Sequence, residues 1–182
     1  KNLLRGFQVN DVDIKTLLQH PVSKTLFTFF KLFPRTYKEE HIHLTGSLTA
    51  EFIFPRLKKL LEGANGDIYR RKIVAVYGED ALPIRSIQDV DGLIRLKDHE
   101  RFGRYLEILL LAKLILVDRQ VHRDAAFHMA NELFTKYNVG MIRLKFTLSR
   151  ASSNEADKIP GLEDVSEEDV VMGLYEGFME FK

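Results

Sequence analysis

Two histidines separated by one residue, His41 and His43, are the residues whose type and spacing point most directly to chemistry. In an extended strand, side chains at positions i and i+2 leave the same face, with Cα atoms roughly 6 to 7 Å apart, so both rings can reach one metal ion at about 2 Å. In a helix the same two side chains would diverge by about 200°. The motif therefore predicts a strand and a metal site together.

The residues around the histidines favour a strand with one apolar face. Ile42 and Leu44 alternate with the two rings, and Thr45, Gly46 and Ser47 supply a turn that ends the strand. A helical pattern follows, which would place the histidines at the carboxyl end of a strand that leads into a helix, where barrel and open α/β enzymes carry their chemistry. The alternative is a chance pair, with one ring exposed and the other hydrogen-bonded in the core.

Composition excludes several classes of protein. With 182 residues, of which 45% are hydrophobic and 29% charged, the chain is long enough for one globular core. A net charge of +1 gives no general attraction for nucleic acid or an anionic membrane, and the absence of cysteine excludes disulfides and thiolate metal sites. We expect no membrane span, no signal peptide and a soluble, cytoplasmic protein. Because the first residue is Lys1 and not Met, we also expect that part of the natural polypeptide is missing.

The sequence before the strand, residues 1–39, predicts a helical extension. A first helix would begin near Asn10 and end at His20 and Pro21, and a second short helix would open at Ser23. The second helix is apolar almost all round, so we expect it to be buried against the main domain or a partner subunit. Its apolar residues are Leu26, Phe27, Phe29, Phe30, Leu32 and Phe33.

Helical patterns also follow the histidine strand. A helix should open after Thr49, and Pro55 either lies in its first turn or kinks it. Residues 62–97 predict short helices and loops, a position where a lid or pocket wall is common. One continuous helix is expected from Asp98 to about Val117, and its inward face would consist of Phe102, Tyr105, Leu106, Leu109 and Ala112.

A further helix, a second strand and a last helix complete the pattern. Within the helix expected over residues 119–137, we interpret His122 and His128 as surface or capping contacts. Residues 141–148 alternate apolar and polar, which predicts a strand that is either part of a barrel or antiparallel with one wet face. After a polar loop, Ser166 begins a capping box, and the buried stripe of the last helix would be Val171, Leu174, Tyr175 and Phe178.

These segments together carry a resemblance to a known family. Residues 41–48 look like the first metal motif of the adenosine deaminase family, within the amidohydrolase superfamily of metal-dependent barrels. Residues 138–148 are similar to the family's second strand, and residues 166–171 with Gly177 are similar to its second barrel helix. The resemblance covers about residues 38–182.

The resemblance implies a fold and a division of the chain. The fold class would be α/β, as the helix-rich, amino-terminal fragment of a TIM (β/α)8 barrel. Residues 40–182 would form this first part of the barrel, behind the helical extension of residues 1–39. Since a complete barrel has eight strands and about 250 residues, the barrel would be incomplete.

A zinc site and a substrate class are also implied by the resemblance. His41 and His43 would be two zinc ligands, while Thr45 and Gly46 would lie beside a purine nucleoside or related compound. Thr45 stands where the family usually has an acidic residue that binds ribose, and Lys145 where an arginine is usual. These departures imply a divergent member that acts on an aminopurine compound other than adenosine.

The implied activity is hydrolytic deamination, in which zinc lowers the pKa of a bound water towards about 7 and ammonia leaves the purine. The family's later zinc histidine, its ring-protonating glutamate and its last-strand histidine and aspartates are not found in this sequence. We therefore expect the chain to be inactive alone, with its catalytic residues in a missing C-terminal part, and to associate with the remainder of the parent chain or with itself.

Two other functions remain open. In the first, the chain is a non-catalytic helical interaction module in which both motif histidines are structural and the aromatic segment mediates association. In the second, the barrel hydrolyses another bond, such as a cyclic amide. Neither nucleic acid nor a membrane is an expected partner.

Overall fold

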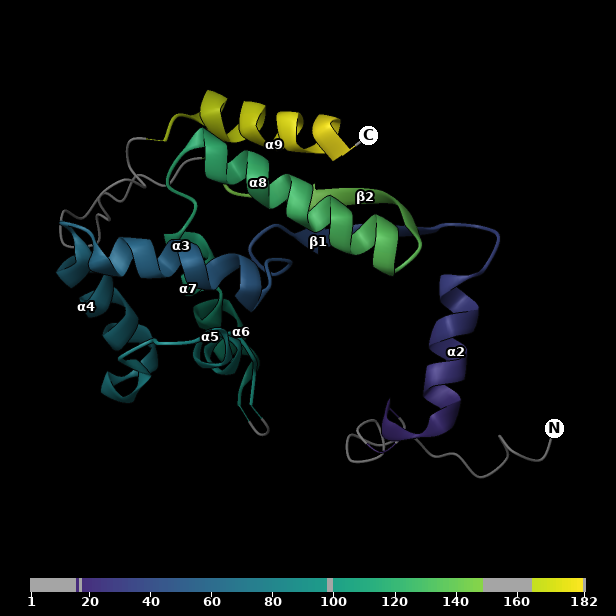
Figure 1. Cartoon of the computed structure of the whole chain (residues 1–182), viewed down its shortest axis with the longest axis horizontal. Coiled ribbons are helices and arrows are strands. Elements are labelled where there is room, and N and C mark those ends of the chain that lie inside the picture. Colours follow the sequence, from purple (N-terminus) through teal and green to yellow (C-terminus); the bar gives the residue numbers. More distant parts are fainter. Residues whose placement is uncertain (1–15, 17, 98–99, 149–164, 182) are drawn as a thin grey trace.

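The computed structural model describes residues 16, 18–97, 100–148 and 165–181. Its described part is a mostly helical α/β structure with a small two-stranded parallel sheet beside the helices (Figure 1). The elements are α2 (Pro21–Lys31), β1 (Tyr37–His43), α3 (Ala50–Glu62), α4 (Gly66–Tyr77), the 3-10 turn η2 (Glu79–Ala81), α5 (Ile87–Leu93), α6 (Phe102–Ile108), α7 (Leu110–Leu114), α8 (Arg119–Ala130), the π-helical segment η3 (Asn131–Lys136), β2 (Val139–Lys145) and α9 (Glu167–Phe181).

Both predicted strands form, and they pair with each other in parallel. Because the connection between them holds eight of the helical segments given above, this is a crossover of the kind that parallel strands require. The antiparallel alternative for the second strand is therefore wrong. Strand β2 also begins and ends earlier than residues 141–148, so Phe146 and Leu148 lie beyond it and are exposed. Its apolar residues Ile142 and Leu144 are partly buried against the core.

The core lies between the helices that follow β1 and the sheet. Many of its fully buried side chains come from the end of β1, from α3 and α4, and from the α7 region: Leu44, Ile53, Leu57, Ile73, Leu111, Leu114, Ile115 and Leu116. Helices α5, α8 and α9 add Val90, Met129 and Val170. Helix α3 begins at Ala50, so Pro55 lies inside the helix and not in its first turn. The core is thus built mainly from helices, with the sheet at one border.

The long helix predicted from Asp98 is divided. In the described part of this stretch, α6 and α7 are separate short helices with Leu109 between them. Tyr105 and Leu106, predicted to face inward, are exposed, whereas Ala112 is buried as expected. The apolar run from residue 108 to residue 116 has no single stripe, so one straight helix could not bury all of it; the break lets successive turns face the core. The side chain of Phe102 lies outside the described set.

Helices α8 and α9 lie side by side and form the most extensive helix pair (Figure 1). A Cβ at Gly173 would lie 2.5 Å from the carbonyl oxygen of Arg119, and one at Gly177 only 2.1 Å from that of Arg123, so both glycines are required for this close approach. The buried stripe of α9 therefore runs through Val170, Gly173, Leu174 and Gly177. The predicted stripe was right at Leu174 and wrong at Val171 and Tyr175, which are exposed.

Helix α2 stands apart from the other helices (Figure 1). It begins at Pro21, with a ring nitrogen of His20 accepting the backbone N–H of Val22. The described residues just before His20 are helical, so a helix ends at the predicted stop and α2 begins directly after it, two residues before the predicted start at Ser23. None of its residues is buried, and the six predicted apolar side chains are all exposed, which contradicts the expected burial against the main domain. The helix predicted from Asn10 and the polar loop after residue 148 fall largely outside the described residues.

Candidate metal-binding site

Strand β1 brings the two motif histidines together at its carboxyl end. The Nε2 atoms of His41 and His43 lie 3.1 Å apart, and the ring centroids are 5.0 Å apart at an interplanar angle of 29°. Both residues are exposed. The rings therefore project side by side from an extended segment, as the spacing of the two residues predicts.

The pairing of the strands is irregular around His41. Between Glu39 and Ile42, strand β1 has one residue more than β2 has between the paired residues Ile142 and Leu144. This extra residue is a bulge, a device that re-aims a side chain relative to regular pairing. The carboxylate of Glu39 accepts a hydrogen bond from the backbone N–H of His41 at 3.2 Å, and this bond stabilises the backbone of the bulge.

The backbone after the motif is fixed by hydrogen bonds. His43 pairs with Lys145 in the sheet, and the next backbone N–H, that of Leu44, donates to the carbonyl oxygen of Lys145 at 3.0 Å. The hydroxyl of Ser47 donates to the carbonyl oxygen of His43 at 2.8 Å, and its N–H donates to that of Leu44 at 3.1 Å. With Leu44 and Leu48 buried, this turn anchors the end of β1 to the core and leaves the rings on the surface.

The two predicted substrate-side residues lie in this turn. Thr45 is half-buried and Gly46 is exposed. The hydroxyl of Tyr105, on α6, lies 3.3 Å from the position that a Cβ on Gly46 would occupy, and the Cβ of His43 lies 3.8 Å from the same position. Sequence reasoning placed Tyr105 in a buried helix face and so missed this contact, because no local pattern links α6 to the turn after β1.

The geometry of the two imidazoles fits one zinc ion. Tetrahedral zinc with bonds of about 2.0 to 2.1 Å separates two of its nitrogen ligands by roughly 3.3 Å. The observed 3.1 Å is close to this separation, and it also fits a hydrogen bond between the two rings. Within the described residues, no group of three or more His, Cys, Asp or Glu side chains gathers around a common point. The two rings would thus supply half of a tetrahedral ligand set.

The histidines of α8 are held in a different way. His122 is fully buried, with Nδ1 at 2.8 Å from the carbonyl oxygen of Asp118, so its interpretation as a surface residue is wrong. His128 is half-buried, with Nε2 at 3.3 Å from the hydroxyl of Thr49 and its ring 4.9 Å from that of Phe52. Burial lowers the pKa of His128, with nearby Lys136 and Arg56 acting in the same direction and Glu132 opposing them.

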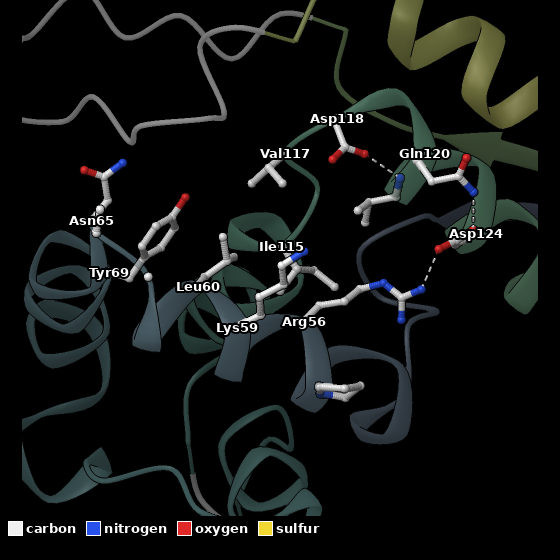
Figure 2. A pocket seen from close by; sticks show the side chains of 14 residues that line it. Arg56, Lys59, Leu60, Asn65, Tyr69, Ile115, Val117, Asp118, Gln120 and Asp124 are labelled. Atoms are coloured by element: carbon white, nitrogen blue, oxygen red, sulfur yellow. Dashed lines mark hydrogen bonds and ion pairs between the residues drawn. The ribbon is translucent and has the colours of Figure 1, made fainter.

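A separate cavity of about 670 Å³ lies between α3, the start of α4 and the start of α8 (Figure 2). Leu60, Ile115 and Val117 contribute its apolar wall. On the α8 side, the guanidinium of Arg56 bonds the carboxylate of Asp124 at 2.7 Å. Neither His41 nor His43 lines this cavity, so the cavity is not part of the candidate metal-binding site.

Comparisons with protein-family models, with curated proteins and with solved structures give no match. The candidate site therefore rests on the sequence motif and on the geometry of β1. Among the described helices, none has both the length and the apolar character needed to cross a bilayer.

Proposed function

We propose that the chain is the amino-terminal part of a zinc-dependent, adenosine deaminase-like hydrolase that deaminates an aminopurine nucleoside or a related compound. The observation that carries the proposal is the approach of the His41 and His43 Nε2 atoms to 3.1 Å on an extended segment. A strand that leads into a helix, with its metal-ligating residues at the carboxyl end, is the arrangement of barrel hydrolases.

The sheet supports the barrel part of this proposal. Strands β1 and β2 are parallel neighbours, and a helix follows each of them, as in the first two units of a TIM (β/α)8 barrel. Every residue of β1 except Ile42 is exposed, which is unusual for a parallel strand, since these are normally covered on both faces. We infer that further strands and helices cover β1 in the complete fold.

Bound zinc would lower the pKa of a coordinated water towards about 7 and so supply hydroxide for attack on the amino-bearing carbon of the purine. The residues of this chain would orient that centre. His41 and His43 would each present Nε2, and the bonds from Ser47 and Leu44 hold the backbone at the end of β1. The remaining zinc ligands and the groups that move protons would come from residues outside the described part.

Zinc content and deamination test the proposal together. In full-length protein purified without added chelator, we expect about one zinc per chain and release of ammonia from adenosine or another 6-aminopurine nucleoside. His41→Ala and His43→Ala should each remove both properties. Zinc retained in both variants, or a wild-type protein that takes up no zinc, would exclude the site.

A second candidate function, a non-catalytic interaction module, is favoured by helix α2. Three of its exposed apolar residues, Val22, Leu26 and Phe29, follow one another at intervals of four and three, the spacing of a helix-pairing seam, and the exposed Phe33 lies two residues beyond the helix. Only basic charges, Lys24 and Lys31, lie on this helix. Such a face is typical of a surface that packs against another polypeptide.

Association measurements separate the two candidates. Phe29→Asp should reduce any self-association seen by analytical ultracentrifugation, while Thr28→Asp, on the polar side of the same helix, should not. If the interaction module is the whole function, zinc content and deamination stay absent under every condition. Zinc-dependent turnover in the same preparation would leave α2 as an accessory surface of an enzyme.

A further inference from the structure

We infer that the cavity between α3, the start of α4 and the start of α8 is a second ligand site, which binds a small carboxylate with an apolar chain or ring. The carboxylate pairs with Lys59, and the apolar part of the ligand lies against Leu60, Ile115 and Val117. The inference goes beyond the proposed deaminase and does not depend on it, because neither motif histidine lines the cavity.

The cavity has the size and the wall of a small-molecule site. Its volume of about 670 Å³ lies within the range of roughly 300 to 1,000 Å³ that is typical of ligand pockets. Leu60 reaches it from α3, while Ile115 and Val117 belong to the segment that joins α7 to α8. Ile115 is fully buried and the other two are half-buried, so the apolar wall extends from the interior of the protein to its surface. An apolar group that enters the cavity leaves water, which favours binding.

Three of the charged groups around the cavity are already bonded within the protein. The guanidinium of Arg56 donates to one carboxylate oxygen of Asp124 at 2.7 Å, and the side-chain amide of Gln120 donates to the other at 2.8 Å (Figure 2). The carboxylate of Asp118 accepts the backbone N–H of Val121 at 2.8 Å and so caps α8. The protein itself therefore engages both carboxylates and the guanidinium.

Lys59 is the remaining charged residue of the cavity wall. It makes no hydrogen bond or ion pair with any residue that the structure describes. Figure 2 shows its side chain pointing from α3 into the cavity, between Leu60 and Arg56. Lys59 therefore presents the one ammonium of the described wall that is open to a ligand. A single ammonium suits a carboxylate with one charge, whereas a phosphate is recognised best by the planar fork of an arginine.

The end of the cavity that lies at α4 is polar and uncharged. Asn65 and Tyr69 line it (Figure 2). The side chain of Asn65 does not cap α4. Burial raises the pKa of Tyr69, so its phenol is neutral at physiological pH. Because an amide and a phenol attract no second charged group, a ligand with one carboxylate and an uncharged body fits this end better than a dicarboxylate or a zwitterion.

Titration of the full-length protein with octanoate tests the inference, with 1-octanol as a probe of the same chain length and no charge. Amide chemical shifts in NMR spectra report both the place of binding and the Kd. We expect octanoate to move the signals of Leu60, Asn65 and Val117 in a saturable way and to raise the melting temperature, since it binds the folded state.

Lys59→Gln removes the charge and keeps most of the side-chain length. Its Kd for octanoate should rise about three- to tenfold, the effect of one charged pair near the surface, while its Kd for 1-octanol should change less than about twofold. Lys58→Gln is the matched control, because Lys58 is the neighbouring residue on α3, pairs with Glu62 at 3.8 Å and does not line the cavity. It should leave both values unchanged.

Val117→Phe tests the apolar half of the site. The larger side chain takes up space in the cavity, so the Kd values of octanoate and 1-octanol should both rise about threefold or more. An unchanged circular dichroism spectrum would show that the variant is folded. If the folded variant bound both compounds as the wild type does, the apolar wall would not be the binding surface.

Other results would also overturn the inference. The absence of any saturable shift with octanoate would exclude the site. Shifts confined to α2, whose apolar side chains are exposed, would assign the binding to that helix and not to the cavity. Equal effects of Lys59→Gln and Lys58→Gln would exclude the pairing of the carboxylate with Lys59. None of these results depends on zinc content or turnover, so the deaminase proposal stands or falls separately.

Discussion

Two regions of the molecule each carry a pair of histidines, and they hold them in opposite ways. At the end of β1, His41 and His43 are exposed and their Nε2 atoms converge to 3.1 Å. On α8, His122 is fully buried and His128 is half-buried, and they contact the carbonyl oxygen of Asp118 and the hydroxyl of Thr49. The first pair points to solvent and the second pair points into the protein.

The difference shows what the environment adds to a residue type. An imidazole that is surrounded by protein atoms, as in α8, contributes packing and local hydrogen bonds. Two imidazoles that converge on the surface contribute little to packing, and both Nε2 atoms stay open to a shared ligand or to a hydrogen bond with each other. The spacing of each pair in the sequence produces this contrast. His41 and His43 are two residues apart on a strand, so their side chains leave the same face. His122 and His128 are six residues apart on a helix, so their side chains point in directions that differ by about 120°.

The largest expected effect concerns the strand pair. His41→Ala should weaken zinc binding by roughly 100-fold or more, since one of four ligands contributes about a quarter of a total binding free energy of 10 to 16 kcal/mol. The affinity would be measured by competition with a chromogenic chelator at pH 7.5.

His128→Ala is the matched control for that measurement, because it removes the same ring from the other region. It should leave zinc affinity unchanged. If both variants lost zinc affinity equally, the two histidine pairs would not differ in metal binding. If His41→Ala kept the zinc affinity of the wild type, His41 and His43 would not form a metal site.

Crowding the helix pair should have the next largest effect. Gly177→Ala places a Cβ 2.1 Å from the carbonyl oxygen of Arg123, so α8 and α9 must separate, which should cost about 2 kcal/mol of unfolding free energy. Urea denaturation monitored by circular dichroism would measure the cost. At Gly92 an added Cβ meets no atom within 4 Å, so Gly92→Ala should be neutral or stabilising. Equal destabilisation by both changes would contradict the close packing of α8 on α9.

The start of α8 offers a smaller test of the same region. The carboxylate of Asp118 accepts the backbone N–H of Val121 at 2.8 Å, so Asp118→Ala should lower the unfolding free energy by about 1 kcal/mol. Arg101, at the start of α6, makes no such side-chain bond. Arg101→Ala should therefore cost less in the same denaturation assay, and a reversed order would contradict the assigned cap.

The smallest effect is the pH dependence that His128 contributes. Burial lowers the pKa of His128 in the folded protein, while an unfolded histidine titrates near about 6.5. Because the unfolded chain then binds the proton more readily, stability should fall as the pH drops through and below this value. In His128→Gln, the loss of unfolding free energy between pH 7.5 and 5.5 should be smaller than in the wild type. An identical loss in both proteins would remove His128 as a source of this dependence.

The sequence predicted those features that depend on local periodicity. The alternation around Ile42 and in β2 identified both strands, and the spacing of His41 and His43 identified their shared face. The capping signal at Ser166 located α9, where its hydroxyl accepts the N–H of Asp169.

Features that depend on long-range packing could not be predicted in this way. Gly173 and Gly177 have little hydrophobic surface, so the apolar pattern could not show that they form the contact face of α9. The prediction that a helix stops at His20 and Pro21 agrees with the described residues, but the next helix begins at Pro21 itself and not at Ser23, because proline is favoured in the first turn of a helix. The approach of Tyr105 to Gly46 joins segments that only the tertiary fold brings together.

The most direct test of the central claim is anomalous diffraction at the zinc edge from crystals of the full-length protein. We expect one peak at about 2.0 to 2.1 Å from Nε2 of both His41 and His43, and no peak beside His122 or His128. A fully loaded zinc ion bound elsewhere, with the two strand rings joined only by their own hydrogen bond, would contradict the account.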